Sequence, residues 1–469
     1  MTMAIQETLL YSAFTGLSLA AFQFLHHVQP TPYMDEMFHI PQAQRYCAGR
    51  FQEWDPKITT PPGLYLISVG VLHPLSQWLG QVLCQTYHLR LINVGLASLT
   101  LIILYRISEQ IHGGKHYYDA QQALLSSLNM CLCPLFYFFS FFYYTDVGST
   151  FFVVFMYSLH LDGRDWCASF IGLLAVSFRQ TNIIWVAFVA WQRLGPLLVH
   201  NIHMHMLEGP HPVKINLDTR GQVVELLEGV YFLLFDPRRT WRLIRLALPQ
   251  VGGYLLVGMA FVSFLILNEG IVVGDREAHV ACFHPTQVLY FCAFCLGLAW
   301  PFLLPLLPAF LTFGRRHYRL IIFQAILCYC IVDVYSLAHP YLLADNRHYT
   351  FYIWRRLLDR SFWSKYLPIP IYMFGAFGVL HNLKRTNIAF KVSYPVFVMV
   401  SLTPQLLLEF RYFIVPYMFF RIQVPPTSWL KLGAELAFFL CINAVTFYLY
   451  VQKPFEWEHD SGKVQRFMW

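Results

Sequence analysis

The chain has 469 residues, of which 57% are hydrophobic and only 13% are charged. Soluble globular proteins carry roughly 25% charged residues, and the mean hydropathy of this chain is positive, at +0.47. So few charges exclude a soluble enzyme as well as a disordered or fibrous chain. The composition predicts an all-α polytopic membrane protein, with on the order of a dozen helices at ~20 residues per span.

Charge and cysteine content narrow the class further. Lys and Arg total 33 against 26 Asp and Glu, an excess that in membrane proteins marks cytoplasmic loops, and no basic run is long enough to predict nucleic-acid binding. Most of the eleven cysteines lie in apolar runs, and the spacing of Cys292 and Cys295 has no second pair that would complete a zinc site. Cys47 and Cys282 lie in polar connectors, and the sequence leaves open a disulfide between them.

The first apolar run, residues 9–25, has no preceding Lys or Arg and no cleavage site, which predicts an uncleaved first span. A polar connector follows to about Pro62, and Pro41 within it predicts the first turn of a short helix that ends near Gly49. Residues 63–83 are apolar but interrupted, which favours an interfacial position. Further predicted spans lie at 89–107, 120–143, 147–161, 166–178, 183–199, 246–267, 288–313, 320–337, 367–380, 390–408, 412–420 and 432–451.

One long connector, residues 200–245, separates two groups of spans. It mixes His, Gly and Pro with charges, which predicts a cytoplasmic peripheral segment with an amphipathic helix at 223–235. Its three histidines, His200, His203 and His205, fit a polar surface loop better than a metal site.

Polar clusters interrupt the apolar pattern at the other connectors, which all face one compartment if the count of spans holds. Asp35-Glu36 follows the first span, and a carboxylate there is suited to accept a proton from an incoming hydroxyl. A solvated acid pair or a helix N-terminal acid is the alternative. The remaining clusters are Tyr144-Thr145-Asp146, Arg179-Gln180-Thr181-Asn182, Asp275-Arg276-Glu277, Asp345-Asn346-Arg347-His348 and Glu409-Phe410-Arg411-Tyr412.

These clusters carry groups that bind phosphate and sugar. An Arg near the bilayer costs ~2.5–3.5 kcal/mol unless it is paired or hydrated, and a guanidinium can hold a phosphate in two bonds. An interfacial turn is the alternative for the Arg179 cluster. The motifs for ATP binding, dinucleotide binding, serine hydrolysis and zinc hydrolysis are absent from the sequence, as is the D-x-D of nucleotide-sugar transferases.

Five blocks of sequence, at residues 32–47, 54–65, 177–186, 342–356 and 407–417, resemble one family in order along nearly the whole chain. This family is the dolichyl-phosphate-glucose-dependent α-1,2-glucosyltransferases of the endoplasmic reticulum. The resemblance implies a single GT-C transmembrane domain over residues 1–469, with about 12–14 helices. It also implies a first lumenal loop at 29–88 with membrane-parallel helices, and a lumenal active site.

The resemblance further implies a reaction. The family transfers the third, terminal glucose from dolichyl phosphate glucose to the diglucosylated dolichyl-diphosphate oligosaccharide, with inversion. The partners are therefore the lipid-linked donor, the lipid-linked acceptor and the bilayer, whereas the oligomeric state is not predicted. A polytopic transporter or a regulatory subunit of another membrane protein is the alternative, although no inverted repeat supports a transporter.

The residues take roles under this resemblance. Asp35 is the expected base, and the role of Glu36 is not separable from it. The donor phosphate and sugar are assigned first to Arg347 and His348, then to Arg179 and Arg411. A divalent cation near Asp35 is conceivable, but no ligand cluster demands a metal or another cofactor. Further donor contacts are expected from Asp345, Asn346, Gln180 and Asn182, and the pocket lining from Tyr33, Trp54, Asp55, Asp146, Tyr349, Glu409 and Tyr412.

Overall fold

The protein is almost entirely helical, as its composition predicts. A computed structural model describes residues 3–208, 237–276, 280–458 and 462–469. Helices make up most of these described residues. The strands of the described part are the short pair β1 (Phe455–Glu456) and β2 (Val464–Gln465), which run antiparallel. The predicted class, an all-α polytopic membrane protein, is therefore confirmed.

The N-terminal half runs from the first helix to the long connector. Its elements are α1 (Met3–Val28), α2 (Glu36–Cys47), α3 (Gly63–Leu79), α4 (Thr86–His112), α5 (Ala120–Cys131), α6 (Pro134–Phe139), α7 (Thr145–Leu161), α8 (Asp165–Phe178), the 3-10 turn η1 (Gln180–Asn182) and α9 (Ile183–Glu208). The predicted amphipathic helix at 223–235 lies outside the described residues, as do the side chains of His200, His203 and His205.

The C-terminal half contains more broken helices. Its elements are α11 (Pro237–Asn268), α12 (Thr286–Leu298), α13 (Trp300–Leu303), η2 (Leu304–Leu306), α14 (Leu307–Arg316), α15 (Tyr318–Tyr335), α16 (Pro340–Ala344), α17 (Tyr349–Ile353), the π-helical turn η3 (Trp354–Leu358), α18 (Ile369–Asn382), η4 (Leu383–Arg385), α19 (Ile388–Leu402), η5 (Phe410–Phe413), α20 (Ile414–Gln423) and α21 (Trp429–Gln452).

Among the described residues, five helices are long and apolar enough to cross a membrane, and a bent pair raises the number to six. Several predicted spans are shorter or broken, because proline ends or bends a helix. The predicted span 120–143 is interrupted before Pro134, and the span 288–313 bends by 87° near Pro301. The unbroken spans are Ile5–Val28, Thr86–His112, Thr240–Asn268, Tyr318–Tyr335 and Trp429–Gln452.

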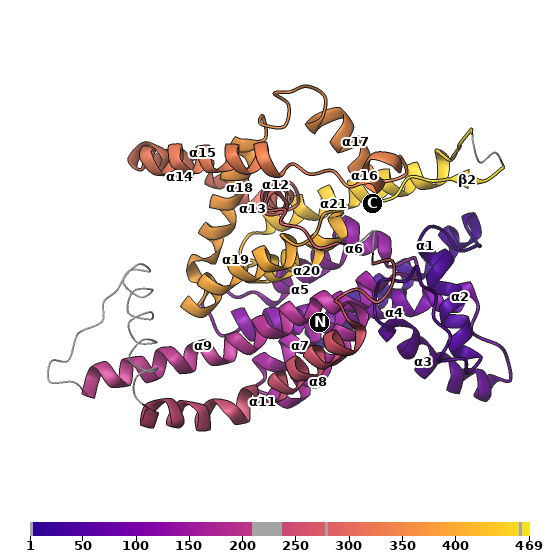
Figure 1. Ribbon diagram of the computed structural model, residues 1–469, viewed down its shortest axis with the longest axis horizontal. Helices are drawn as coiled ribbons and strands as arrows, with labels where there is room; N and C mark the ends of the chain where they lie inside the picture. The colour runs from indigo at the N-terminus through magenta and orange to yellow at the C-terminus, as the bar shows by residue number, and fades with distance from the viewer. Residues whose placement is uncertain (1–2, 209–236, 277–279, 459–461) are drawn as a thin grey trace.

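Close helix packing brings polar helix ends together at one place. Helix α7 packs between α4 and α8, and α11 packs on α8 and α9 (Figure 1). A Cβ at Gly148 would overlap the ring of Phe178, so only glycine allows the start of α7 to lie this close to the end of α8. Asp146, in the first turn of α7, therefore lies beside Arg179, which directly follows α8.

The first connector differs from its prediction in two respects. Helix α2 begins at Glu36, so Pro41 lies inside the helix and not in its first turn. The carbonyl that loses its helical partner to this proline belongs to Met37, a residue that is 54% exposed and thus open to water. The disulfide joins Cys47 to Cys84, and Cys282 is a free thiol. Packing of α2 on α3 brings Cys84 to the end of α2, a contact that sequence spacing does not reveal.

Candidate active site

Charged side chains from four segments meet at one end of the helical bundle. Asp35 precedes α2, Asp146 lies in the first turn of α7, Arg179 follows α8, and Glu409 and Arg411 flank the start of η5. These residues come from four of the polar connectors of the sequence. We call them the acid–arginine cluster.

Arg411 is the centre of this cluster. Its guanidinium bonds Asp35 (Nη1–Oδ2 3.1 Å) and Glu409 (Nη2–Oε2 2.6 Å), and Nη1 lies 3.7 Å from Oδ2 of Asp146. It also lies over the rings of Phe139 and Tyr144, at 5.4 and 5.3 Å from their centroids. One guanidinium thus interacts with three carboxylates and lies against two aromatic rings.

The carboxylate of Asp35 is open to an incoming molecule. Its side chain is 43% exposed, whereas that of Arg411 is 13% exposed. Met34, just before it, has a left-handed φ of 56°, a conformation that is uncommon for a side chain of this size and that clusters at functional sites. The backbone N–H of Asp35 donates to Tyr144 Oη at 3.2 Å, which holds the turn in place.

Electrostatics keep the cluster ionised. The surrounding protein disfavours the charged form of Asp35 by desolvation, but Arg411, with smaller contributions from His39 and His348, holds the pKa of this carboxyl below its ordinary value. Desolvation is likewise outweighed at Glu409, where Arg411 lowers the pKa. Both acids are therefore carboxylates at neutral pH.

Glu36 has surroundings unlike those of its neighbour. It is fully buried, and its two oxygens accept from Arg90 Nε and Nη2 at 2.8 and 2.6 Å. The same oxygens accept from the backbone N–H groups of Tyr143 (2.6 Å) and Tyr33 (3.1 Å). With all four bonds made inside the protein, Glu36 is a structural anchor for the turn that presents Asp35.

Asp146 and Arg179 complete the cluster. One oxygen of Asp146 is bonded to Arg179 Nη1, while its buried Oδ2 has no hydrogen-bond partner among the described residues. Arg179 also lies 5.3 Å from the ring centroid of Tyr412. This oxygen is buried and lies 3.7 Å from Arg411 Nη1, so its interaction with the guanidinium is ionic and not a hydrogen bond.

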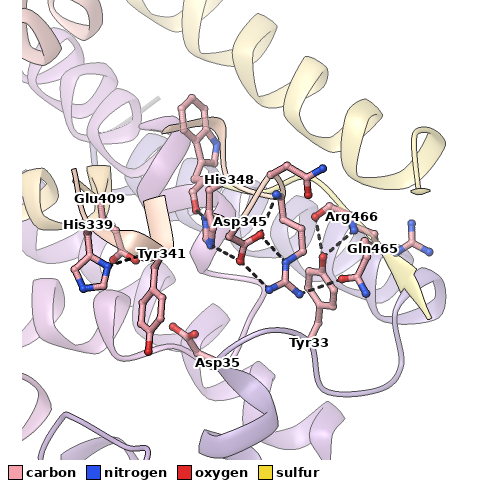
Figure 2. A network of polar contacts seen from close by, with 12 residues as sticks. Tyr33, Asp35, His339, Tyr341, Asp345, His348, Glu409, Gln465 and Arg466 are labelled. Atoms are coloured by element: carbon pink, nitrogen blue, oxygen red, sulfur yellow. Dashed lines mark hydrogen bonds and ion pairs between the residues drawn. The ribbon is translucent and has the colours of Figure 1, made fainter. Parts of the chain in front are cut away.

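A second polar group borders the cluster (Figure 2). Arg347 is held in two bonds by Asp345, Nε–Oδ1 at 2.9 Å and Nη2–Oδ2 at 2.7 Å, and its Nη1 donates to Gln465 Oε1 at 3.0 Å. His348 Nε2 lies 3.9 Å from Asp345 Oδ2, and this ring interacts electrostatically with both Asp35 and Glu409. Arg347 is thus paired with one acid, and His348 borders Asp35.

Several other predicted site residues have structural partners instead. Asn182 Nδ2 donates to Ser149 and to the carbonyl of Ala175. The remaining contacts are those of Gln180 to the Thr59 carbonyl, Trp54 to the rings of Tyr46 and Tyr65, Asp55 to the N–H of Lys57, Asn346 to Trp457, Tyr349 to the ring of Trp469, and Tyr33 to Arg466.

Sequence reasoning missed four kinds of contact in this region. Arg90 lies inside an apolar span, where only its charge signals a role. His39 is buried, and its Nδ1 lies 2.5 Å from Tyr65 Oη; burial lowers the pKa of His39 to about 4. Tyr144 belongs to one of the polar clusters, but nothing in the sequence predicts its contact with Asp35. The C-terminal residues that contact Tyr33 and Arg347 have no apolar pattern that predicts their position.

The cluster provides more negative than positive charge. Asp35, Asp146 and Glu409 face the two guanidiniums of Arg179 and Arg411. No group of three or more His, Cys, Asp or Glu in a position to hold a metal ion occurs within residues 3–208, 237–276, 280–458 and 462–469. The two arginines balance two of the three acids, so one negative charge of the cluster remains unbalanced by them.

The fold and this cluster define a multi-pass helical membrane protein in which acids and arginines from four polar connectors meet. The chain belongs to the DIE2/ALG10 family, whose model matches residues 29–422.

The chain is similar to curated proteins from animals and plants over nearly its whole length. A human relative named Dol-P-Glc:Glc(2)Man(9)GlcNAc(2)-PP-Dol alpha-1,2-glucosyltransferase is 37% identical over an alignment of 449 positions that covers 93% of each chain. The rat protein of the same name is 39% identical over 450 residues, again 93% of each. The Arabidopsis thaliana protein of that name is 33% identical over an alignment of 504 positions, gaps included, that covers 95% of this chain and 96% of the plant protein.

Proposed function

We propose that this protein transfers the terminal glucose from dolichyl phosphate glucose to the diglucosylated dolichyl-diphosphate oligosaccharide, forming an α-1,2 linkage. The proposed reaction is the one that the names of the three relatives describe. None of the three is named as a transporter or a regulatory subunit. The observation that carries the site is the exposed Asp35 carboxylate held beside Arg411. The protein is accordingly an inverting glucosyltransferase, because a β-linked donor yields an α-linked product in one displacement.

Asp35 is the general base in this proposal. As the acceptor 2-hydroxyl attacks the anomeric carbon, the bond from that carbon to the phosphate oxygen breaks, and the hydroxyl proton passes to the Asp35 carboxylate. The charge left on dolichyl phosphate is stable, so a strong general acid is not required. Glu36 takes no part in the chemistry, because all of its hydrogen bonds are internal.

Arg411 and His348 receive the donor phosphate in this proposal, because both act on Asp35, the proposed base. Arg347, favoured by the sequence for this role, is held in two bonds by Asp345 and remains a candidate, since Arg411 is itself paired with acids. A phosphate that binds Arg411 competes with Asp35 for the guanidinium, since the two are now 3.1 Å apart. When the donor binds, Asp35 loses its interaction with Arg411, and its proton affinity rises. The carboxylate is then a better base for the attack of the acceptor hydroxyl.

The site faces the lumen of the endoplasmic reticulum in this proposal. The disulfide between Cys47 and Cys84 joins the two ends of the connector that follows Asp35, and disulfides persist in oxidising compartments. The loop 29–88 is therefore lumenal in this proposal. Helix α9 continues to Glu208 and α11 begins at Pro237, so the connector assigned to the cytoplasm is the segment between them, shorter than the predicted 200–245. Maleimide labelling after reduction of sealed microsomes tests this: Cys47 should be labelled only after the membrane is permeabilised.

Transfer by purified protein tests the function. The wild type, reconstituted in liposomes with radiolabelled dolichyl phosphate glucose and the diglucosylated acceptor lipid, should form a product with one more glucose. The linkage should be α-1,2, and no product should form when the third glucose is already present. Product no greater than in empty liposomes would refute the proposal.

A further inference from the structure

A polar cleft of about 570 Å³ opens beside the acid–arginine cluster and has no role in the reaction as proposed. Its volume lies in the range of sites that hold small organic ligands, roughly 300–1,000 Å³. It is lined by Tyr341, Leu343, Ala344, Asp345, Asn346, Arg347, Phe351, Arg355 and Trp457.

Two distant parts of the chain build the walls of this cleft. One wall comes from α16 and the loop after it, and the other is Trp457, which directly follows β1 of the β1–β2 hairpin. Trp457 Nε1 donates to Asn346 Oδ1 at 2.8 Å, and the guanidinium of Arg347 lies 4.6 Å from the Trp457 ring centroid. The indole is thus held in one orientation by contacts at its edge and at one face.

The hairpin itself is fixed to the site. The Arg466 N–H donates to Tyr33 Oη at 2.7 Å, and the Met468 N–H donates to the carbonyl of Arg347 at 2.9 Å. Gln465 accepts from the Arg347 guanidinium, as Figure 2 shows. Tyr33 is two residues before Asp35, so the hairpin contacts both the loop that carries the base and the loop that forms the cleft.

The chemistry of the lining favours a neutral, hydroxyl-rich ligand over a phosphate. Asp345 cancels the charge of Arg347 in two bonds, which leaves Arg355 at the exposed rim as the remaining cation of the lining. Tyr341 is 47% exposed, and in Figure 2 its side chain points toward Asp35. Aromatic faces next to amide and carboxylate groups suit a sugar ring, which presents C–H bonds on its faces and hydroxyls at its edge.

We propose that this cleft binds sugar residues of the acceptor oligosaccharide and that Trp457 is a binding residue for them. The inference rests on the proposed function, and it deepens it by naming where the acceptor is held. Trp457 lies beyond residues 29–422, the part that matches the family model. Acceptor binding therefore depends on a C-terminal segment that lies outside the matched region.

The test compares Trp457→Ala with Val464→Ala, a control on the same hairpin whose exposed side chain does not line the cleft. Titration with the soluble glycan released from the diglucosylated acceptor measures binding without requiring transfer. Trp457→Ala should weaken glycan binding about tenfold, as expected for the loss of one ring contact. Val464→Ala should bind like the wild type, and Trp457→Phe should retain most of the affinity.

Steady-state transfer gives the second readout. Trp457→Ala should raise the KM for the acceptor lipid about tenfold and leave the KM for dolichyl phosphate glucose unchanged. Equal glycan affinity in Trp457→Ala and the wild type would overturn the cleft assignment. So would a raised KM for dolichyl phosphate glucose in Arg355→Ala, because it would show that the cleft binds the donor phosphate. Glycan binding that needs Trp457, without any transfer by the wild type, would overturn the proposed reaction and keep the cleft.

Discussion

Replacing Glu36 by Gln should destabilise the protein far more than its small change in shape suggests. Each Glu36 oxygen accepts two hydrogen bonds, one from Arg90 and one from a backbone N–H, of Tyr143 or Tyr33. A glutamine amide must turn its NH₂ group toward two of these donors, whichever way it is oriented. It also removes the charge that balances a guanidinium only 1% exposed.

The expected cost follows from the burial of both partners. Breaking a buried ion pair by removing one partner costs about 3–5 kcal/mol, because the other charge is left uncompensated. Glu53 provides the matched control in the same loop: it is 48% exposed and pairs with Arg50 at 3.0 Å. A surface pair of this kind contributes about 0–1 kcal/mol, so Glu53→Gln should change stability little.

Thermal unfolding in detergent measures the difference. Glu36→Gln should lower the unfolding midpoint by several degrees, and Glu53→Gln by about one degree or less. Replacing both partners, Glu36→Gln with Arg90→Met, should recover part of the loss, because the unpaired buried charge is removed as well. Equal midpoints for Glu36→Gln and Glu53→Gln would refute the anchoring role of Glu36.

Three further predictions concern the same connector. Asp35→Asn should lower transfer about 10²–10⁴-fold, as expected for a lost general base, with an unchanged unfolding midpoint; transfer near the wild-type rate would remove Asp35 as the base. Stability should fall as the pH is lowered from about 6.5 toward 4, because His39, with its pKa lowered to about 4, stays neutral in the folded protein while the unfolded chain binds a proton. The pH dependence of the unfolding midpoint should be flatter in His39→Gln, and an identical slope would contradict this account. Cys47→Ser should cost about 4 kcal/mol, from the 37-residue separation of Cys47 and Cys84; a midpoint equal to that of the reduced wild type would confirm that the effect comes from the disulfide, and one equal to the oxidised wild type would refute it.

The helical class and the meeting of polar connectors follow from the sequence because both depend on local signals. Composition determines that the chain enters a membrane, and charges that interrupt apolar runs collect at helix ends, where water reaches them. Asp35, Asp146, Arg179 and Arg411 are all predicted in this way. Their mutual distances depend on packing between α7 and α8, which a list of spans does not contain.

Other features of the site depend on geometry that no local pattern encodes. Asp35 and Glu36 look equivalent in sequence. In the structure they follow Met34, which has a left-handed φ, and Asp35 is partly exposed whereas Glu36 is buried in the core. Arg347 is predicted from the sequence as a phosphate ligand, and in the structure Asp345, two residues earlier, bonds its guanidinium. Such competition between neighbours becomes visible only when the side chains are placed.

The contact between Tyr33 and Arg466 spans 433 positions of the chain. A ribosome that has delivered the whole first loop to the membrane has therefore produced only one side of this contact. Every intervening helix must be inserted before the hairpin can dock, so translation that stops ahead of it should yield a membrane-embedded but incomplete protein. Docking of the hairpin on Tyr33 thus requires that α21, which precedes it, has already been synthesised.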